Sequence, residues 1–262
     1  MSNILDEIVE VKKLEVERLR RERNNRPRND YSNRTCISLK EKLLDPNTTG
    51  IIAEFKRKSP SKGWFNRDAS AVEIVSQYEK HGAACASVLT DSSFFGGNLN
   101  DLYLAREAVN IPLLRKDFII DEVQIAEAKR FGADLILLIA AILTPERVSE
   151  LSKEARNYGL EVLLELHDEV ELDHIIDDID LIGINNRDLK TFEVDIDRSL
   201  RMAEKIPSNK IKIAESGISS VENIRLFREN GFKGFLIGEN FMKAEDPGKE
   251  FQHFVNKLYI ND

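Results

Sequence analysis

The chain has 262 residues, of which 42% are hydrophobic and 32% are charged. This composition excludes a largely disordered, collagen-like or low-complexity protein. The formal net charge is −8, with 38 basic and 46 acidic residues. A chain this acidic is not expected to bind nucleic acid in general, so only binding through a local basic patch stays open.

The amino-terminal segment predicts a helical extension. Apolar residues recur at helical spacing from Ile4 to Leu19, and no apolar core of a secretory signal is present. The arginine-rich stretch 18–28 is interpreted as the solvated face of a helix. The alternative, an arm for nucleic acid or an acidic partner, is weakened by interrupting glutamates and by the lack of aromatic residues that could stack on bases. A second short helix is predicted at about 38–44.

From residue 51 onward, short apolar runs alternate with amphipathic stretches. The runs are too short for helices and lack polar alternation, so each predicts a strand buried on both faces. The predicted strands cover residues 51–55, 84–90, 111–115, 134–141, 161–166, 180–184, 210–214 and 234–238. Eight strands alternating with helices predict an α/β protein with a (β/α)8 TIM barrel. An open doubly wound sheet is disfavoured, because no Gly-rich loop follows the first strand.

These elements predict a single domain over residues 1–262, with an N-terminal helical extension at 1–48 and the barrel at 49–262. Cys36 and Cys85 lie far apart in sequence and form no CxxC motif, which fits a reducing cytoplasm. No apolar run is long enough for a membrane span. The four histidines are scattered, so no metal site is predicted, and His167 is expected to have a surface or capping role.

The chemistry of such a barrel is expected at the carboxyl ends of its strands. Polar residues there include Glu54, Lys56, Lys116, Glu165, Asn185, Glu215 and Ser216. Lysines and carboxylates around one cavity can divide the roles of general acid and general base. The leucines that flank Glu165 predict an apolar environment that raises its pKa.

A phosphate site is predicted where Ser216-Gly217 and Gly238-Glu239 follow the last two strands, since backbone N–H groups there can hold an anion. Ser59 and a lysine of the first loop are expected to close the other side. On an acidic protein, such a site needs a local basic mouth, which would be supplied by Lys56, Arg57, Lys58, Lys62, Arg115, Lys116 and Arg187.

Several segments carry a resemblance to a known family. They are IIAEFKRKSPSKG, SFFGG, LLRKDFIID, LLELHD, GINNRDLKTFEVD, AESGI and FLIGENFM, in this order. Together they resemble indole-3-glycerol-phosphate synthase, an enzyme of tryptophan biosynthesis, over essentially the whole chain. The SPSKG loop and GINNRDL are the most specific of these motifs in combination.

The resemblance implies the substrate 1-(2-carboxyphenylamino)-1-deoxyribulose 5-phosphate, and no metal or organic cofactor. The implied products are indole-3-glycerol phosphate, carbon dioxide and water. Matched by motif, the catalytic and substrate-contacting positions are Glu54, Lys56, Lys116, Glu165, Asn185 and Ser216. The matched binding positions are Ser59, Phe95, Phe118, Arg187, Gly217, Gly238 and Glu239. A serine is common in relatives at the position of Glu239, so its carboxylate is expected to point away from the phosphate.

In this interpretation Lys116 protonates the ketone during ring closure, while Glu165 and Glu54 serve the later dehydration. Phe95 and Phe118 form an apolar wall for the aromatic ring. Which lysine and which carboxylate act at each step stays open. A Schiff-base aldolase with Lys116 as nucleophile is one alternative, and a binding protein that uses segment 18–28 is another. No nucleic-acid or membrane partner is expected, and the oligomeric state stays open between a monomer and an association with other tryptophan-pathway enzymes.

Overall fold

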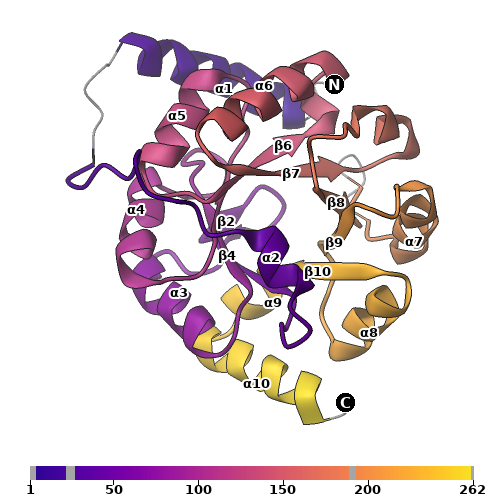
Figure 1. Cartoon of the computed structure of the whole chain (residues 1–262). Coiled ribbons are helices and arrows are strands. Elements are labelled where there is room, and N and C mark those ends of the chain that lie inside the picture. Colours follow the sequence, from indigo (N-terminus) through magenta and orange to yellow (C-terminus); the bar gives the residue numbers. More distant parts are fainter. Residues whose placement is uncertain (1–3, 22–26, 189–192, 261–262) are drawn as a thin grey trace.

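The computed structural model describes residues 4–21, 27–188 and 193–260. Eight parallel strands form a closed barrel in the order β1-β10-β9-β8-β7-β6-β5-β4 (Figure 1). The strands are β1 (Ile51–Phe55), β4 (Cys85–Leu89), β5 (Leu113–Lys116), β6 (Leu135–Ile139), β7 (Glu161–Leu166), β8 (Leu181–Asn185), β9 (Ile211–Glu215) and β10 (Phe232–Ile237). The predicted (β/α)8 barrel is confirmed. A small hairpin of β2 (Lys58–Ser59) and β3 (Gly63–Trp64) in the first loop was not predicted.

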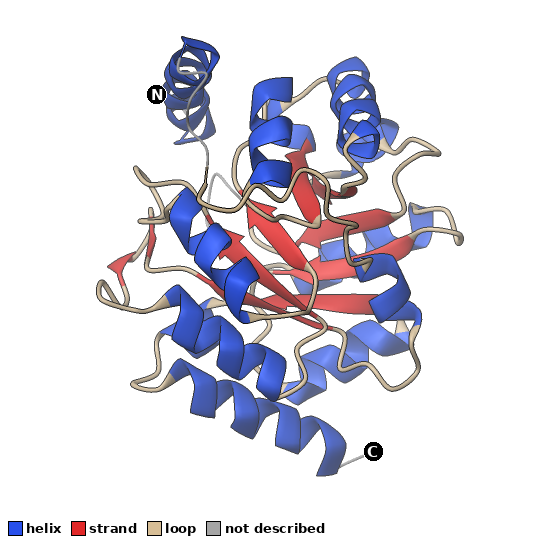
Figure 2. Cartoon of the chain, turned by 60° about the vertical axis from the view of Figure 1, so that its left-hand side comes forward, coloured by secondary structure: helices blue, strands red, loops and turns tan. Residues whose placement is uncertain are grey.

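Helices surround the strands on the outside of the barrel (Figure 2). They are α3 (Ala71–Lys80), α4 (Leu99–Ala108), α5 (Glu122–Arg130), α6 (Pro145–Asn157), α7 (Ile196–Lys205), α8 (Val221–Glu229), α9 (Glu239–Met242) and α10 (Pro247–Ile260), with the 3-10 helices η1 (Ala140–Ile142) and η2 (Glu169–His174). Several begin at a capping side chain, as at Ser70 and Thr144, which accepts a first-turn N–H. Within the described ranges, no helix is long and apolar enough to cross a membrane.

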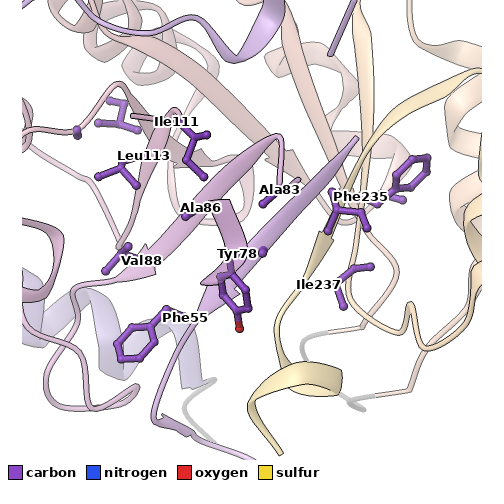
Figure 3. Close-up of a cluster of buried hydrophobic side chains, with 14 of the residues drawn as sticks. Phe55, Tyr78, Ala83, Ala86, Val88, Ile111, Leu113, Phe235 and Ile237 are labelled. Atoms are coloured by element: carbon purple, nitrogen blue, oxygen red, sulfur yellow. The ribbon is translucent and has the colours of Figure 1, made fainter. Parts of the chain in front are cut away.

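Side chains along each strand alternate between two apolar layers. The outer layer packs strand residues such as Phe55 and Leu113 against helix residues such as Tyr78 of α3 (Figure 3). The inner layer gathers the intervening residues, such as Ile52 and Leu114, at the centre of the barrel. This two-residue period determines which strand residues point toward the barrel axis.

The two helices of the N-terminal extension lie at opposite ends of the barrel. Helix α2 (Leu39–Leu44) lies at the amino ends of the strands, where Glu161 at the start of β7 accepts a hydrogen bond from Leu39 N at 2.8 Å. Helix α1 (Ile4–Arg21) lies at the carboxyl ends and packs beside α5. The predicted helices at 4–19 and 38–44 are therefore present. Helix α1 therefore lies over the end of the barrel at which the site was predicted.

Candidate active site

The alternation that builds the inner layer also determines the polar residues of the site. Glu54, Lys116 and Glu165 each follow an inward-facing apolar residue by two positions, so their side chains also point into the barrel. Asn185 and Glu215 occupy the corresponding places at the ends of β8 and β9. Five polar side chains therefore converge at the carboxyl ends of the strands.

A cavity of about 280 Å³ opens at this end of the barrel. All the predicted catalytic and binding residues line it: Glu54, Lys56, Ser59, Phe95, Lys116, Phe118, Glu165, Asn185, Arg187, Ser216, Gly217, Gly238 and Glu239. Ile4, Leu5 and Ile8 of α1 complete the wall. The extension is therefore part of the cavity and not only a support for the barrel.

Lys116 lies at the centre of the polar cluster. Its Nζ is 3.2 Å from Oε2 of Glu165 and 3.8 Å from Oε2 of Glu215. Burial alone would lower the pKa of Lys116, but the nearby carboxylates outweigh burial and raise this pKa above its usual value. The amine is therefore protonated at neutral pH, which suits a proton donor and not a nucleophile.

The prediction of a raised pKa for Glu165 is wrong. Burial does act to raise this pKa, but Lys116, His167 and Asn185 all favour the carboxylate and hold its pKa well below the usual range. Asn185 Nδ2 donates a hydrogen bond to Oε1 of Glu165 at 3.1 Å. The leucines next to Glu165 in sequence point to the other side of the strand or lie deeper in the barrel, so they do not determine its electrostatics.

The carboxyl group with the raised pKa is that of Glu215. Its side chain is almost completely buried, and burial together with the negative charge of Glu165 raises its pKa well above the usual value. Gly183 on the neighbouring strand makes room for it, because a Cβ there would lie 2.1 Å from Oε1 of Glu215. Sequence reasoning placed Glu215 at a strand end but assigned it no role. Its position two residues after the inward-facing Ile213 was the signal that could have identified it.

His167 is also placed differently from the prediction. It is 7% exposed, and its Nε2 lies 2.9 Å from Oε1 of Glu165. Burial lowers the pKa of His167, but the carboxylates of Glu165 and Glu171 outweigh burial and raise the pKa to about 9. The expected surface or capping role is therefore wrong. The adjacent Asp168 takes the capping role, at the start of η2.

A second acid–base pair is formed by residues of the first strand and loop. Lys56 Nζ lies 2.7 Å from Oε1 of Glu54. The absence of a side chain at Gly238 is required here, because a Cβ would approach the same oxygen to 2.5 Å. This pair therefore lies between the central cluster and the loop that follows β10.

The loop after β9 has an unusual backbone. Ser216 and Gly217 both adopt left-handed conformations, with φ of 64° and 70°. A left-handed serine costs about 1–3 kcal/mol, and such strain is typical of functional sites. Asn186 holds the turn by donating a hydrogen bond to the Ser216 carbonyl oxygen at 2.7 Å. The predicted phosphate-binding loop is thus a left-handed turn that borders the cavity.

The other half of the predicted phosphate corner follows β10. Gly238 precedes α9, and among the described residues no side chain caps the first turn of this helix. The Glu239 carboxylate contacts the ammonium groups of Lys62 and Lys243, and Arg187 Nη2 lies 3.7 Å from it. Burial acts to raise the pKa of Glu239, but the two lysines lower it to about 2. Three cations around one carboxylate leave this corner positively charged.

Aromatic and aliphatic side chains form the opposite wall. The ring centroids of Phe95 and Phe118 are 5.9 Å apart, and both rings border the cavity. Ile8 of α1 belongs to the same apolar cluster. The cavity therefore has an apolar wall, a cationic corner and a buried set of acids and bases in between.

Three residues of the predicted basic mouth do not line the cavity. Arg57 pairs with Asp101 of α4, and Arg115 is buried between Asp117 and Glu127 at 3.1 and 3.0 Å. Lys58 donates to the Ser93 carbonyl oxygen. These three side chains satisfy structural partners, because strand alternation turns Arg115 outward and the hairpin turns Lys58 aside. The remaining members of the predicted set line the cavity or contact Glu239.

The fold and the cavity define a (β/α)8-barrel enzyme of the acid–base type, with a cationic corner at the carboxyl ends of β9 and β10. Among the described residues, no group of three or more His, Cys, Asp or Glu side chains is arranged to hold a metal ion. The sequence profile described as Indole-3-glycerol phosphate synthase matches residues 5–254. The chain belongs to the indole-3-glycerol phosphate synthase family.

Individual relatives agree with this assignment. The indole-3-glycerol phosphate synthase of Bacteroides thetaiotaomicron is 46% identical over 98% of this chain and 100% of its own length. That of Koribacter versatilis is 48% identical over 78% of this chain and 79% of its own length. Among solved structures, 3-hexulose-6-phosphate synthase from Salmonella typhimurium has a TM-score of 0.65 at 12% identity, covering 82% of this chain and 100% of that one. The tryptophan synthase alpha subunit of Legionella pneumophila has a TM-score of 0.62 at 14% identity, covering 84% and 96%. At this low identity, the two structures support the fold alone.

Proposed function

We propose that this chain converts 1-(2-carboxyphenylamino)-1-deoxyribulose 5-phosphate into indole-3-glycerol phosphate, carbon dioxide and water. This is the carboxy-lyase reaction of its family, in tryptophan biosynthesis. The single observation that carries the assignment of the site is the position of Lys116 between Glu165 and Glu215, in a cavity with one apolar and one cationic end. The substrate matches these two ends, since it has an aromatic ring at one end and a phosphate at the other.

The proposed orientation follows from this match. The aromatic ring lies against Phe95 and Phe118. The phosphate binds the backbone of Ser216-Gly217 and of Gly238, near the cations that now surround Glu239. Glu239 contributes its backbone N–H, while Lys62 and Lys243 hold its carboxylate aside. Ser59 closes the first-loop side of the cavity.

Ring closure forms the bond between the carboxyl-bearing aromatic carbon and the ketone carbon of the sugar. The ketone oxygen gains negative charge as this bond forms, so a proton donor is needed beside it. Lys116 is the proposed donor, because its raised pKa keeps the ammonium form and its side chain points into the cavity. Loss of carbon dioxide from the carboxyl-bearing aromatic carbon, which is the attacking atom, then restores conjugation in the ring.

Dehydration requires a base for the anilino N–H and an acid for the departing hydroxyl group. Glu165 is the proposed base, because its lowered pKa keeps it ionised and Asn185 fixes its orientation. Glu215 lies in the same cluster, and its raised pKa favours the protonated form, so it is a second proton source besides the lysines. Glu54 and Lys56 form a second acid–base pair, which lies nearest the phosphate corner. Lys56 is placed to neutralise the anionic groups of the substrate.

The geometry disfavours the two alternatives. A Schiff-base aldolase needs a neutral amine, whereas the carboxylates around Lys116 stabilise its ammonium form. For the nucleic-acid arm, Arg20 pairs with Asp121 at 2.6 Å and Arg21 lies 3.6 Å from Glu17. Arg23 and Arg26 of the same stretch lie outside the described residues. The proposed partner is therefore the small-molecule substrate, and the free thiols of Cys36 and Cys85 suit a cytoplasmic location.

The test is a turnover assay on the purified chain. The protein is incubated with the substrate, and indole fluorescence and released carbon dioxide are followed together. We expect both products in equal amounts. A parallel sample receives borohydride and a ketose phosphate, and a covalent adduct on Lys116 would instead identify an aldolase.

A further inference from the structure

Lys12 of α1 is a buried cation far from the catalytic lysines in sequence. It is 1% exposed, and its Nζ lies 2.9 Å from Asp91 Oδ2 and 2.8 Å from Asp117 Oδ1. Glu15 is a third partner at 2.8 Å. Burial disfavours the charge of Lys12, but the paired aspartates outweigh burial and raise its pKa. A charge held this deeply is tolerated only when it is well paired, so the contact is a specific one.

The two aspartates hold the loops that carry the aromatic wall. Asp91 follows β4, and its Oδ1 accepts hydrogen bonds from the backbone N–H groups of Phe94 and Phe95, at 2.7 and 3.1 Å. Asp117 follows β5, and its Oδ1 accepts from the backbone N–H of Phe118 at 2.8 Å. The Lys12 ammonium group therefore links the two aspartates that hold the backbone at Phe95 and at Phe118.

The same contact determines how α1 lies on the barrel. Ile4, Ile8 and Lys12 are spaced four residues apart and so share one face of the helix. Ile4 and Ile8 line the cavity. The ion pairs of Lys12 therefore fix the rotation of α1 that brings these two side chains over the aromatic wall.

We infer that Lys12 is a positioning residue for the aromatic end of the substrate, because it ties α1 to the loops that carry Phe95 and Phe118. The inference rests on the proposed function, which assigns the aromatic ring to this wall. The phosphate corner lies on β9 and β10 and shares none of these contacts. Loss of Lys12 should therefore weaken the binding of an aromatic ligand and leave the binding of inorganic phosphate unchanged.

The experiment compares Lys12→Met with the matched control Lys13→Met, whose side chain is 59% exposed and pairs only locally with Glu10 at 2.7 Å in the described structure. Dissociation constants for 2-aminobenzoate and for inorganic phosphate are measured by calorimetry, and KM and kcat by turnover. For Lys12→Met we expect about tenfold weaker 2-aminobenzoate binding, about tenfold higher KM, a smaller fall in kcat and unchanged phosphate binding, since a 1 Å displacement of positioning residues costs up to ~10²-fold. The control should behave as the wild type.

Equal weakening of 2-aminobenzoate and phosphate binding, or no change in either dissociation constant, would overturn the inference. If Lys12→Met does not fold, Asp91→Asn is the second variant, because its side-chain carbonyl can still accept from Phe94 and Phe95 while the ion pair is lost. It should weaken 2-aminobenzoate binding about threefold and leave phosphate binding unchanged; an unchanged 2-aminobenzoate constant overturns the inference. The calorimetric constants do not depend on turnover. A wild-type protein that binds both ligands but makes no product would therefore contradict the proposed function and not the role of Lys12.

Discussion

Replacing Glu165 by glutamine separates a catalytic from a structural role for this carboxylate. Glutamine keeps the size of the side chain and one acceptor oxygen, which can face either Lys116 or Asn185, but it cannot take up a proton. If Glu165 is the base of the dehydration step, kcat should fall by roughly 10²–10⁴-fold, the usual contribution of a positioned base. KM should change far less, because the apolar wall and the phosphate corner are untouched.

The expected stability cost is small despite the buried position. Removing one partner of a buried ion pair typically costs about 3–5 kcal/mol. Here Lys116 has Glu215 as a second partner at 3.8 Å, and the pKa of Glu215 is raised partly by the charge of Glu165. Loss of that charge should lower the pKa of Glu215 and favour its carboxylate, which would restore most of the pairing with Lys116. A cost of about 1–2 kcal/mol is expected, which corresponds to a few degrees in Tm for a chain of this size.

The assay measures kcat, KM and Tm for the wild type, for Glu165→Gln and for the control Glu169→Gln. Glu169 is a half-exposed carboxylate just beyond the same strand, and it pairs with Lys205. The control should retain wild-type kinetics. A Glu165→Gln protein that is strongly destabilised but turns over at a near-normal rate would refute the assignment of Glu165 as a base.

Three further outcomes are expected. Lys116→Ala should lose at least ~10²-fold in kcat while circular dichroism shows an intact fold; a loss of only a few-fold would exclude it as the main proton donor. Crystals soaked in sulfate should show the anion on the backbone of Ser216, Gly217 and Gly238, and an anion bound elsewhere in the mouth would contradict the phosphate site. The pKa of His167 is raised from 6.5 to about 9, so its ion pair stabilises the fold fully below about pH 6.5 and is lost as the pH rises through about 9. His167→Gln should therefore lower Tm most near pH 6 and very little near pH 10, and a deficit independent of pH would argue against the ion pair.

The barrel was predictable because its strands are buried on both faces. Runs such as 51–55 and 161–166 are apolar without alternation, and the structure places strands with the same limits there. The ends of the other runs are less well defined by sequence, as for 134–141, where Ala140 begins a 3-10 turn instead. Strand-end position also sufficed to bring the predicted residues to one cavity, since the carboxyl ends of parallel strands meet at one face.

Electrostatics was harder to predict, because it depends on neighbours from other strands. Glu165 was expected to have a raised pKa from its adjacent leucines, but Lys116 of β5 lowers this pKa most, and His167 and Asn185 of β8 add to its effect. Lys12 shows the same limitation. Its spacing from Ile8 places it on the buried face of α1, yet a lysine is normally expected in solvent unless its partners are known. Those partners, Asp91 and Asp117, lie far away in sequence.

The most direct test of the whole account is a crystal structure with indole-3-glycerol phosphate bound. We expect the indole ring against Phe95 and Phe118, the phosphate on the backbone at Ser216-Gly217 and Gly238, and the reacting ring atoms within hydrogen-bonding reach of Lys116 and Glu165. Product bound in the reverse orientation, or outside the barrel mouth, would contradict the proposed site.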